Sequence, residues 1–305
     1  MSRRQKAYLY LIATAALWGA AGPIIKYTLE GIDPIPFLTY RFVIAGLFSV
    51  VFFLVKIAKG KKFRQLRAHL PLALLYGFLA VPVTLGILFF ALDNSTVLDL
   101  TLIGVAGPLL VTLGGTLFFR DHITHRERIG IGIVLAGVFF NSIVPIFSLG
   151  SEVRFTGNLL LILYLISDCG SVLVAKKAVR LKIKSSNLTN LAFIVGAIIL
   201  VPIALITNGA NETLSAIFSL PFKYHLGVWY MALLSGNLAY YFYVRGQRTI
   251  EVSEASLFNY IQPLFMIPLA VLWLKESLSK TFIIGAIIIT IGLVIAELKK
   301  KRYNT

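Results

Sequence analysis

The sequence predicts an all-α integral membrane protein with ten transmembrane helices, built from two inverted five-helix repeats. The chain of 305 residues is 58% hydrophobic and only 14% charged, and its mean hydropathy is +0.84. Many uncharged stretches approach the roughly 20 residues that a helix needs to cross a bilayer. Such stretches form helices, because lipid contains no water to satisfy backbone polar groups. A pattern in the first half of the chain also recurs in the second half, which predicts the duplication.

The first half contains five predicted spans. Their bounds are read from the charged residues that interrupt the apolar stretches. The spans run between Lys6 and Lys26, over 34–56, between His69 and Asp93, between Asp99 and Arg120, and between Arg128 and Glu152. The first span begins like a signal sequence, but no clear cleavage site follows, so we expect it to be retained as a helix.

Five further spans are predicted in the second half. They run over 156–176, between Lys184 and Glu212, between Lys223 and Arg245, between Glu254 and Lys275, and between Lys280 and Glu297. Two of the ten spans contain a charged residue in their interior: Arg41 lies in 34–56 and Asp168 in 156–176. Short connections join the spans, as expected of a compact helical membrane protein.

The basic residues predict the orientation. Most of the 29 lysines and arginines fall on the side of the N-terminus, whereas Arg154, Lys223, Lys275 and Lys280 fall on the other side. The positive-inside rule therefore places both termini in the cytoplasm, and we expect the plasma (inner) membrane of a prokaryote. The net charge of +16 is attributed to loops that face anionic lipid. Nucleic-acid binding is not expected, because the basic residues are scattered over short loops.

Two segments of the chain repeat one another without a gap. Residues 97–137 align with 252–292, which places Pro108 on Pro263 and Asp99 on Glu254. Earlier segments match more weakly at an offset of 151 residues. The predicted repeats are 1–150 and 151–305. Because each contains an odd number of helices, the copies are inverted in the membrane, as in secondary transporters that bind substrate at the repeat interface.

The sequence resembles the drug/metabolite transporter superfamily, in particular its EamA-type ten-helix members. The residues that carry the resemblance are "LWGAAGPIIKYTLEGIDPIPFLTYRFVIAG" (17–46), "GPLLVTLGGTLFFRDHITHRERIGIGIVLAGV" (107–138) and "QPLFMIPLAVLWLKESLSKTFIIGAIIITIGLVI" (262–295). This chain departs from the family pattern at Asp121, where Glu is usual, and at Asp99, where a small apolar residue is usual. The resemblance implies alternating-access transport of small metabolites, often export, and does not fix the substrate.

Two acidic residues are the candidate protonatable groups. Asp168 lies near the middle of its span, where a carboxylate costs about 2.5–3.5 kcal/mol on insertion scales. We expect it to carry a proton or to bind a cationic substrate. The alternative is a structural ion pair with Lys26 or Arg41. Asp99 begins a predicted helix, so its alternative role is to cap that helix.

Lys26 and Arg41 are each expected to take part in a gate or in a structural ion pair with a nearby acidic residue. Both lie near the outer ends of their predicted spans, close in sequence to Glu30 and Asp33. Pro108 and Pro263 are expected to act as hinges, because a proline inside a helix removes a backbone donor and loosens the preceding turn. The alternative is a static kink, which is common in membrane helices.

Further polar and aromatic residues are predicted to contact the substrate. A small-molecule site needs a few placed polar groups on apolar walls. The candidates, besides Asp99 and Asp168, are Trp18, Asn237, Tyr240, Tyr241, Asn259 and Gln262. Asn237, Tyr240 and Tyr241 are expected on one side of a helix, and Asn259 and Gln262 share a face. For the tyrosines the alternative is packing between helices or at the lipid interface.

These features predict a secondary active transporter that exports a small amino-acid-like or amine-like metabolite. We expect no enzyme activity, metal or cofactor, because the four histidines are not clustered and no catalytic or nucleotide-binding motif is present. The expected partners are a small-molecule substrate, membrane lipid, and protons as one candidate coupling ion. The alternatives are an uptake or exchange carrier for sugar or nucleotide-linked solutes, and a small-solute channel.

Overall fold

The computed structural model describes residues 2–120, 123–144, 152–247 and 257–297, and their secondary structure is helical, without strands. The helices of the first half are α1 (Arg3–Gly19), α2 (Ala21–Leu29), α3 (Pro34–Ala58), α4 (Arg64–Ala68), α5 (Leu70–Phe78), the π-helix η1 (Leu79–Val83), α6 (Thr84–Asn94), α7 (Val97–Gly104), α8 (Gly107–Phe119) and α9 (His125–Ile143). Those of the second half are α10 (Glu152–Arg180), α11 (Ser185–Thr207), α12 (Ala210–Phe218), α13 (Phe222–Trp229), the π-helix η3 (Tyr230–Leu238), α14 (Ala239–Gln247), the 3₁₀-helix η4 (Leu257–Ile261), α16 (Gln262–Leu272) and α17 (Lys280–Glu297).

Six helical stretches of the described residues are long and apolar enough to cross a membrane. They are Arg4–Leu29, Pro34–Ala58, Leu70–Asn94, Val97–Phe119, Arg154–Arg180 and Ser185–Thr207. Shorter apolar helices cover Phe258–Leu272 and Lys280–Ala296. The protein is therefore an all-α integral membrane protein, as predicted. The number of ten crossings remains a prediction.

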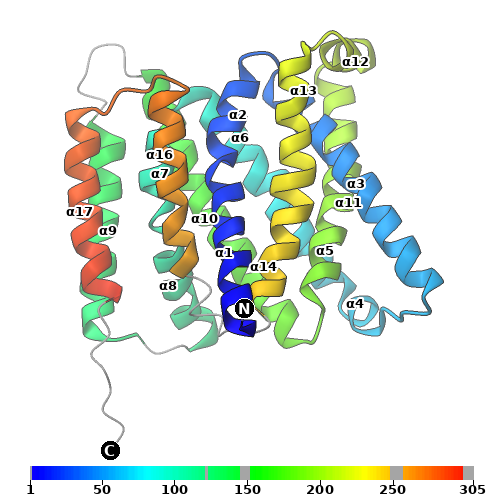
Figure 1. Cartoon of the computed structure of the whole chain (residues 1–305), viewed down its shortest axis with the longest axis horizontal. Coiled ribbons are helices and arrows are strands. Elements are labelled where there is room, and N and C mark those ends of the chain that lie inside the picture. Colours follow the sequence, from blue (N-terminus) through cyan, green and yellow to red (C-terminus); the bar gives the residue numbers. More distant parts are fainter. Residues whose placement is uncertain (1, 121–122, 145–151, 248–256, 298–305) are drawn as a thin grey trace, which may run out of the picture.

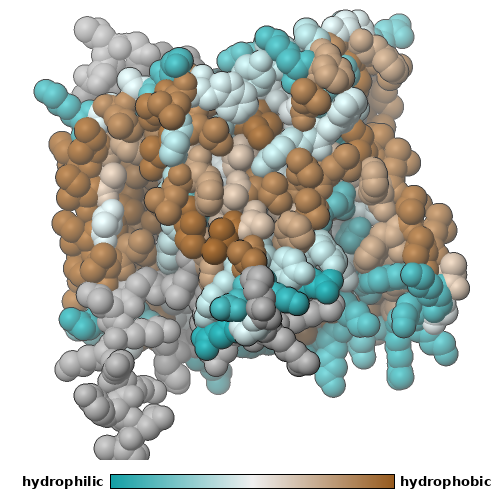
Figure 2. Space-filling view, viewed as in Figure 1, coloured by the Kyte–Doolittle hydropathy of each residue, from teal (hydrophilic) through white to brown (hydrophobic). Residues whose placement is uncertain are grey.

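The outer surface carries an apolar belt. Figure 2 shows hydrophobic side chains over the middle of the molecule and hydrophilic ones at its two ends. Large apolar side chains of the described residues are freely exposed, among them Leu117 at 78% and Ile206 at 83%. Exposed apolar surface of this extent is unusual for a soluble monomer and suits contact with lipid chains.

Helices of the two halves pack against one another reciprocally. The α9–α17 pair stands at one end of the molecule and the α3–α11 pair at the other (Figure 1). Between them, α1 packs on α14 and α16, and α10 packs on α6 and α8. Exchanging each helix for its counterpart in the other half reproduces these contacts, which is the pattern expected of two copies related by a twofold axis.

Equivalent positions of the two halves meet between α3 and α11. At the offset of 151 residues, Phe42 corresponds to Phe193 and Gly46 to Ala197. The Phe42 and Phe193 rings lie 6.0 Å apart, and a Cβ added at Gly46 would lie 3.1 Å from the Cβ of Ala197. Each pair thus consists of sequence equivalents in direct contact, which is the packing expected where a twofold axis passes between two helices.

Local irregularities of the helices also recur in both halves. The π-helices η1 and η3 begin at Leu79 and Tyr230, 151 positions apart. New helices begin after Ala106 and after Ile261, 155 positions apart, with Pro108 and Pro263 in the first turn that follows. Proline is favoured there because the first amides of a helix have no intrahelical acceptor. The repeat in the sequence is therefore a repeat of backbone geometry as well.

The first helix begins and the last helix ends on the same side of the molecule (Figure 1). The basic α4 and the adjoining end of α3 lie on this side too. This arrangement agrees with an even number of crossings. The assignment of this side to the cytoplasm remains a prediction from the positive-inside rule.

Candidate functional site

A carboxylate and three tyrosine hydroxyls gather deep in the protein, on helices of both halves. Asp168 and Tyr164 lie one turn apart on α10, Tyr76 lies near the end of α5, and Tyr240 lies at the start of α14. The Asp168 carboxylate interacts electrostatically with all three hydroxyls. The Tyr76 and Tyr240 hydroxyls also interact with each other. We call these four residues the central cluster.

The Asp168 carboxylate has no ionic partner among the residues that the structure describes. The Ser171 hydroxyl donates to the main-chain carbonyl of Asp168 at 2.9 Å, so this hydrogen bond does not involve the Asp168 carboxylate. Lys26 and Arg41, the structural partners considered from the sequence, contact other groups. Asp168 is partly buried, and its carboxylate lies near hydroxyls carried by α5, α10 and α14. This carboxylate is available to a ligand.

Both π-helices adjoin the central cluster. Tyr76 precedes η1 by three residues, and Tyr240 follows η3 by two. Asn237 donates from its side-chain amide to the carbonyl of Ala232 at 3.1 Å, so this candidate residue stabilises η3 itself. π-helical turns are frequent at functional sites. The irregular backbone therefore occurs where the polar side chains gather.

Trp18 forms an aromatic wall beside the central cluster. Its indole packs edge-on against Tyr240 with ring centroids 5.4 Å apart. The indole nitrogen donates to the Ser235 carbonyl at 3.0 Å, and the Tyr230 hydroxyl donates to the Leu17 carbonyl at 2.8 Å. These two bonds fix α1 against η3. Trp18 thus offers a ring, and not a free donor, to the central cluster.

Tyr241 lies away from the central cluster. Its side chain is 51% exposed, and its hydroxyl accepts a hydrogen bond from Arg245 one turn later. The expectation that Asn237, Tyr240 and Tyr241 line one side of a regular helix therefore differs from the structure. Tyr240 and Tyr241 are consecutive residues of α14 and so lie about 100° apart around it. The π-helix that ends at Leu238 changes the angular register between Asn237 and both tyrosines.

Asn259 and Gln262 share a face, as predicted, and contact each other. The Gln262 amide donates to the Asn259 side-chain oxygen at 3.3 Å. The backbone of this segment approaches α1 closely: a Cβ at Gly19 would lie 2.7 Å from the Gln262 carbonyl oxygen. The structure thus places this pair next to α1, the helix that also carries Trp18. Their role in substrate binding remains a prediction.

Arg41 is buried without a partner for two of its nitrogens. Its side chain is 5% exposed, and its guanidinium lies over the rings of Phe42 and Phe89, at 4.9 and 5.6 Å. Nε and Nη1 have no hydrogen-bond acceptor. Among the described residues Arg41 forms no ion pair with Glu30 or Asp33, so the expected ion pair is absent. Burial in α3 directs the guanidinium inward, away from the helix end where those acids lie.

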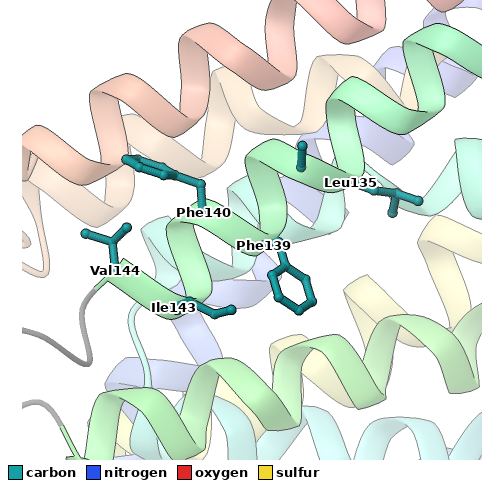
Figure 3. A pocket seen from close by; sticks show the side chains of 6 residues that line it. Leu135, Phe139, Phe140, Ile143 and Val144 are labelled. Atoms are coloured by element: carbon teal, nitrogen blue, oxygen red, sulfur yellow. The ribbon is translucent and has the colours of Figure 1, made fainter.

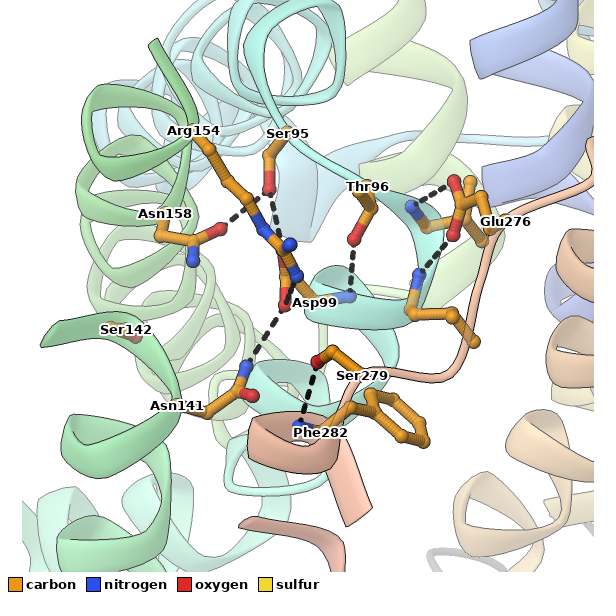
Figure 4. A network of polar contacts seen from close by, with 12 residues as sticks. Ser95, Thr96, Asp99, Asn141, Ser142, Arg154, Asn158, Glu276, Ser279 and Phe282 are labelled. Atoms are coloured by element: carbon orange, nitrogen blue, oxygen red, sulfur yellow. Dashed lines mark hydrogen bonds and ion pairs between the residues drawn. The ribbon is translucent and has the colours of Figure 1, made fainter. Parts of the chain in front are cut away.

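Asp99 is the centre of a polar network at the start of α7 (Figure 4). It is fully buried and accepts from Arg154 Nε at 2.9 Å, from Arg154 Nη2 at 3.1 Å and from the Asn141 amide at 3.0 Å. The Ser95 hydroxyl, 3.5 Å from Asp99, also donates to Asn158 at 2.5 Å. We call these five residues the outer network. The structure does not bring Asp99 into the central cluster.

Two further contacts hold the corner between α6 and α7 beside this network. The Glu276 carboxylate accepts from the backbone amides of Val97 and Leu98 at 2.8 and 2.9 Å, and so caps α7 from outside the helix. The Lys26 ammonium donates to the carbonyls of Leu92 and Asp93 at 2.6 and 3.2 Å, at the end of α6. Each charge lies at the helix end that its sign favours. Lys26 is therefore a helix cap, and among the described residues it forms no ion pair with Glu30 or Asp33.

Several of these residues were not anticipated from the sequence. Tyr164 is four positions before Asp168 and hence on the same helical face, which is a signal that could have identified it. Tyr76, Arg154 and Asn158 reach their partners through tertiary packing, and their local sequence shows no comparable signal. Glu276 aligns with Asp121 at the 155-residue offset of the repeat, but its capping role follows from the structure alone.

The surface also carries an apolar hollow of about 590 Å³ along α9 (Figure 3). Its lining is entirely aliphatic and aromatic: Leu135, Ala136, Phe139, Phe140, Ile143 and Val144. Such a lining suits lipid chains and has no polar group to orient a solute. Within the described ranges no three His, Cys, Asp or Glu side chains cluster in a way that could hold a metal ion.

Comparisons with known proteins agree with this architecture. The profile described as the EamA-like transporter family matches twice, over residues 5–143 and 155–297. The chain is 24% identical to YyaM of Bacillus subtilis (strain 168), named an uncharacterized transporter, over 98% of this chain and 96% of YyaM. It is 26% identical to YedA of Escherichia coli (strain K12), named an uncharacterized inner membrane transporter, over 95% and 90% of the two chains.

A crystal structure of another protein has the same fold. It superposes with a TM-score of 0.66 over 96% of this chain and 97% of that chain, at 16% sequence identity. The double match of the family profile covers nearly the whole chain and confirms the resemblance stated from the sequence. This chain belongs to the EamA-like transporter family.

Proposed function

We propose that this protein is a secondary active transporter that exports a small amino-acid-like or amine-like metabolite by alternating access. The central cluster carries the proposal. It presents an unpaired carboxylate and three hydroxyls beside the Trp18 ring, on α5 of the first half and on α10 and α14 of the second. A carboxylate deep in a membrane protein costs free energy, and binding a substrate cation or a proton gives it a function.

The two-copy architecture supports alternating access. In secondary transporters of this kind, related repeats rock against one another around a site at their interface. The reciprocal helix contacts, the paired π-helices and the paired breaks at Pro108 and Pro263 fit such a motion. On this proposal the two prolines mark hinges. The chain crosses the inner membrane of a prokaryote ten times, and both termini are cytoplasmic.

The outer network serves as the closed gate of the conformation described. The Asp99–Arg154 ion pair joins α7 of the first half to α10 of the second. Glu276 adds a link from the second half to the start of α7. Opening towards the outside requires these bonds to break or to move as a unit. Asp99 then acts on transport through the gate, whereas Asp168 acts on the substrate and is the primary candidate for proton coupling.

Counterflow into proteoliposomes tests the proposal. Purified full-length protein is loaded with unlabelled amino acids, amines or sugars, and uptake of the labelled solute is followed with and without a pH gradient. A carrier gives saturable, self-competed counterflow. Asp168→Asn is expected to abolish it or to remove its dependence on pH, and Asp33→Asn, which alters an exposed carboxylate outside the central cluster, is expected to leave it unchanged.

Each other outcome has a distinct meaning. Linear, unsaturable flux contradicts a carrier and supports a small-solute channel. Counterflow of sugars or nucleotide-linked solutes alone contradicts the proposed substrate class and supports the alternative carrier. If Asp168→Asn retains both transport and its pH dependence, Asp168 is structural and the central cluster is not the substrate site.

A further inference from the structure

We infer that Arg41 is the carboxylate-binding residue of the central site, so that the substrate class is a zwitterion that carries both an ammonium group and a carboxylate. The inference rests on the proposed function and adds the second charge of the substrate. Arg41 lies on α3, was expected to form an ion pair near the outer end of its span, and forms none among the described residues.

The unfulfilled donors of Arg41 are the first observation. A guanidinium presents five N–H donors in a rigid planar fork, cannot be deprotonated in ordinary conditions, and has no acceptor of its own. At Arg41 the side chain is 5% exposed, and both Nε and Nη1 lack an acceptor. Native proteins rarely leave buried donors unpaired, and a buried charge without a partner is costlier still. A carboxylate binds a guanidinium through two parallel bonds, either at the Nε–Nη2 edge or at the Nη1–Nη2 edge, and each edge of Arg41 contains one of these two nitrogens without an acceptor.

The second observation is the position of Arg41 relative to the central cluster. The charge on Arg41 interacts electrostatically with the Tyr240 hydroxyl, the same hydroxyl that interacts with Asp168. The aromatic chain from Phe42 through Phe193 to Tyr240, with ring centroids 6.0 and 6.2 Å apart, connects the two regions. Arg41 and Asp168 therefore both lie near Tyr240, and among the described residues they form no ion pair with each other.

Two opposite charges kept apart in this way match a ligand that carries both. A buried cation and a buried anion that could reach each other would pair, because pairing offsets part of their desolvation. An α-amino acid places its carboxylate and ammonium on one carbon, so it can bind the Arg41 fork with one group and Asp168 with the other. Tyr76 and Tyr240 supply hydroxyls between them, and Trp18 supplies a ring face. An amine without a carboxylate would leave Arg41 unsatisfied.

The test compares solutes that differ only in their charged groups. The first series is leucine, 3-methylbutylamine and 4-methylpentanoate, and the second is phenylalanine, 2-phenylethylamine and 3-phenylpropanoate. Each is assayed for a thermal shift of the purified full chain and for competition of counterflow, after a screen of the proteinogenic amino acids. We expect amino acids to stabilise and to compete, and the amine and the acid of the same series to do so roughly 10- to 100-fold more weakly.

Variants locate the charged contacts. Arg41→Gln is expected to lose roughly 10- to 100-fold in affinity for the amino acid with little change for the amine, so that the two bind alike. Arg41→Lys keeps the charge without the fork and is expected to recover only part of the difference. Lys59→Gln, which removes an exposed basic charge at the end of the same helix, is the matched control and leaves both affinities unchanged.

The comparison in the unmodified protein decides the outcome even if Arg41→Gln fails to fold. Saturable counterflow of amines, with amino acids no better than their amines, overturns the inference and leaves the carrier proposal standing. Equal binding of the amino acid and of its deaminated acid overturns it too, because the ammonium would then contribute nothing. No binding or counterflow with any amino acid overturns the inference, and the absence of counterflow for every solute class overturns the carrier proposal with it.

Discussion

Removal of the Asp99 carboxylate is expected to destabilise the whole protein through the outer network. Asp99 is 0% exposed and accepts three hydrogen bonds of 3.1 Å or less, two of them from one guanidinium. Loss of one partner of a buried ion pair costs about 3–5 kcal/mol. The Arg154 side chain is 36% exposed and can regain water, so the lower end applies. We therefore expect Asp99→Ala to lower the free energy of unfolding by about 3 kcal/mol.

Thermal unfolding of the purified full-length protein measures this loss. A change of about 3 kcal/mol corresponds to a Tm that falls by roughly 5 °C or more for a chain of this size. A double-mutant cycle with Arg154→Ala isolates the pair, and we expect the two single losses to exceed the double loss by about 1–3 kcal/mol. Asp33→Asn, at an exposed carboxylate, should leave Tm unchanged. Losses that add within about 0.5 kcal/mol would refute the coupling, and an Asp99→Ala protein as stable as the wild type would refute the network as a source of stability.

Two further substitutions test other parts of the structure. Gly130→Ala places a Cβ 2.5 Å from both the Gly292 carbonyl oxygen and the Ala296 nitrogen, so α9 and α17 must separate and we expect a loss of about 1–3 kcal/mol in thermal unfolding. Gly132→Ala, where the Cβ meets nothing within 4 Å, should be neutral or slightly stabilising, and equal losses at both positions would contradict the packing. Glu276→Gln keeps an oxygen acceptor for the amides of Val97 and Leu98 but cannot ionise, so it should not lower the stability at neutral pH and should remove the pH dependence of this cap. Burial raises the pKa of the Glu276 carboxyl above its ordinary value, although two backbone amides oppose the shift. The folded state therefore binds this proton more tightly than the unfolded state, and stability from Glu276 is present below the ordinary pKa and is lost as the pH rises through the raised one. A pH–stability profile that Glu276→Gln leaves unaltered would contradict that assignment.

The membrane class and the repeat could be predicted because their signals are local. Hydropathy identifies apolar stretches without knowledge of how they pack, and an ungapped alignment of 97–137 with 252–292 requires no structure. Pro108 and Pro263 do lie at equivalent positions, but each is in the first turn of a new helix and not inside a continuous one as expected. Proline is favoured there because its missing amide would have no intrahelical acceptor. The family profile matches both halves of the chain, in agreement with the repeat.

The partners of the polar residues could not be predicted in the same way. Asp168 stood out as a charge inside an apolar span, but Tyr76 and Tyr240 meet near it only when α5 and α14 pack around α10. The π-helix η3 also changes the helical register between Asn237 and the two tyrosines of α14, Tyr240 and Tyr241. A helical wheel drawn from the sequence assumes a constant rotation per residue and cannot anticipate such a break.

Proximity along the chain was misleading for the basic residues. Arg41 lies close in sequence to Asp33, yet its guanidinium is buried over Phe42 and Phe89. Lys26 caps α6, a helix more than sixty positions away in the sequence. Which face of a helix turns inward depends on packing against the other half of the chain, and spacing alone does not contain that information.

The central claim is that the space beside Asp168 opens to each side of the membrane in turn. The most direct measurement is labelling of Asp168→Cys, in a Cys169→Ser background that removes the chain's single native cysteine, with a membrane-impermeant maleimide added to one side of oriented vesicles at a time. We expect labelling from either side, and a shift of the two rates in opposite directions when a substitution in the outer network, such as Asp99→Ala, favours the outward-open state. Labelling from neither side, or two rates that rise together as in an open pore, would contradict alternating access at this site.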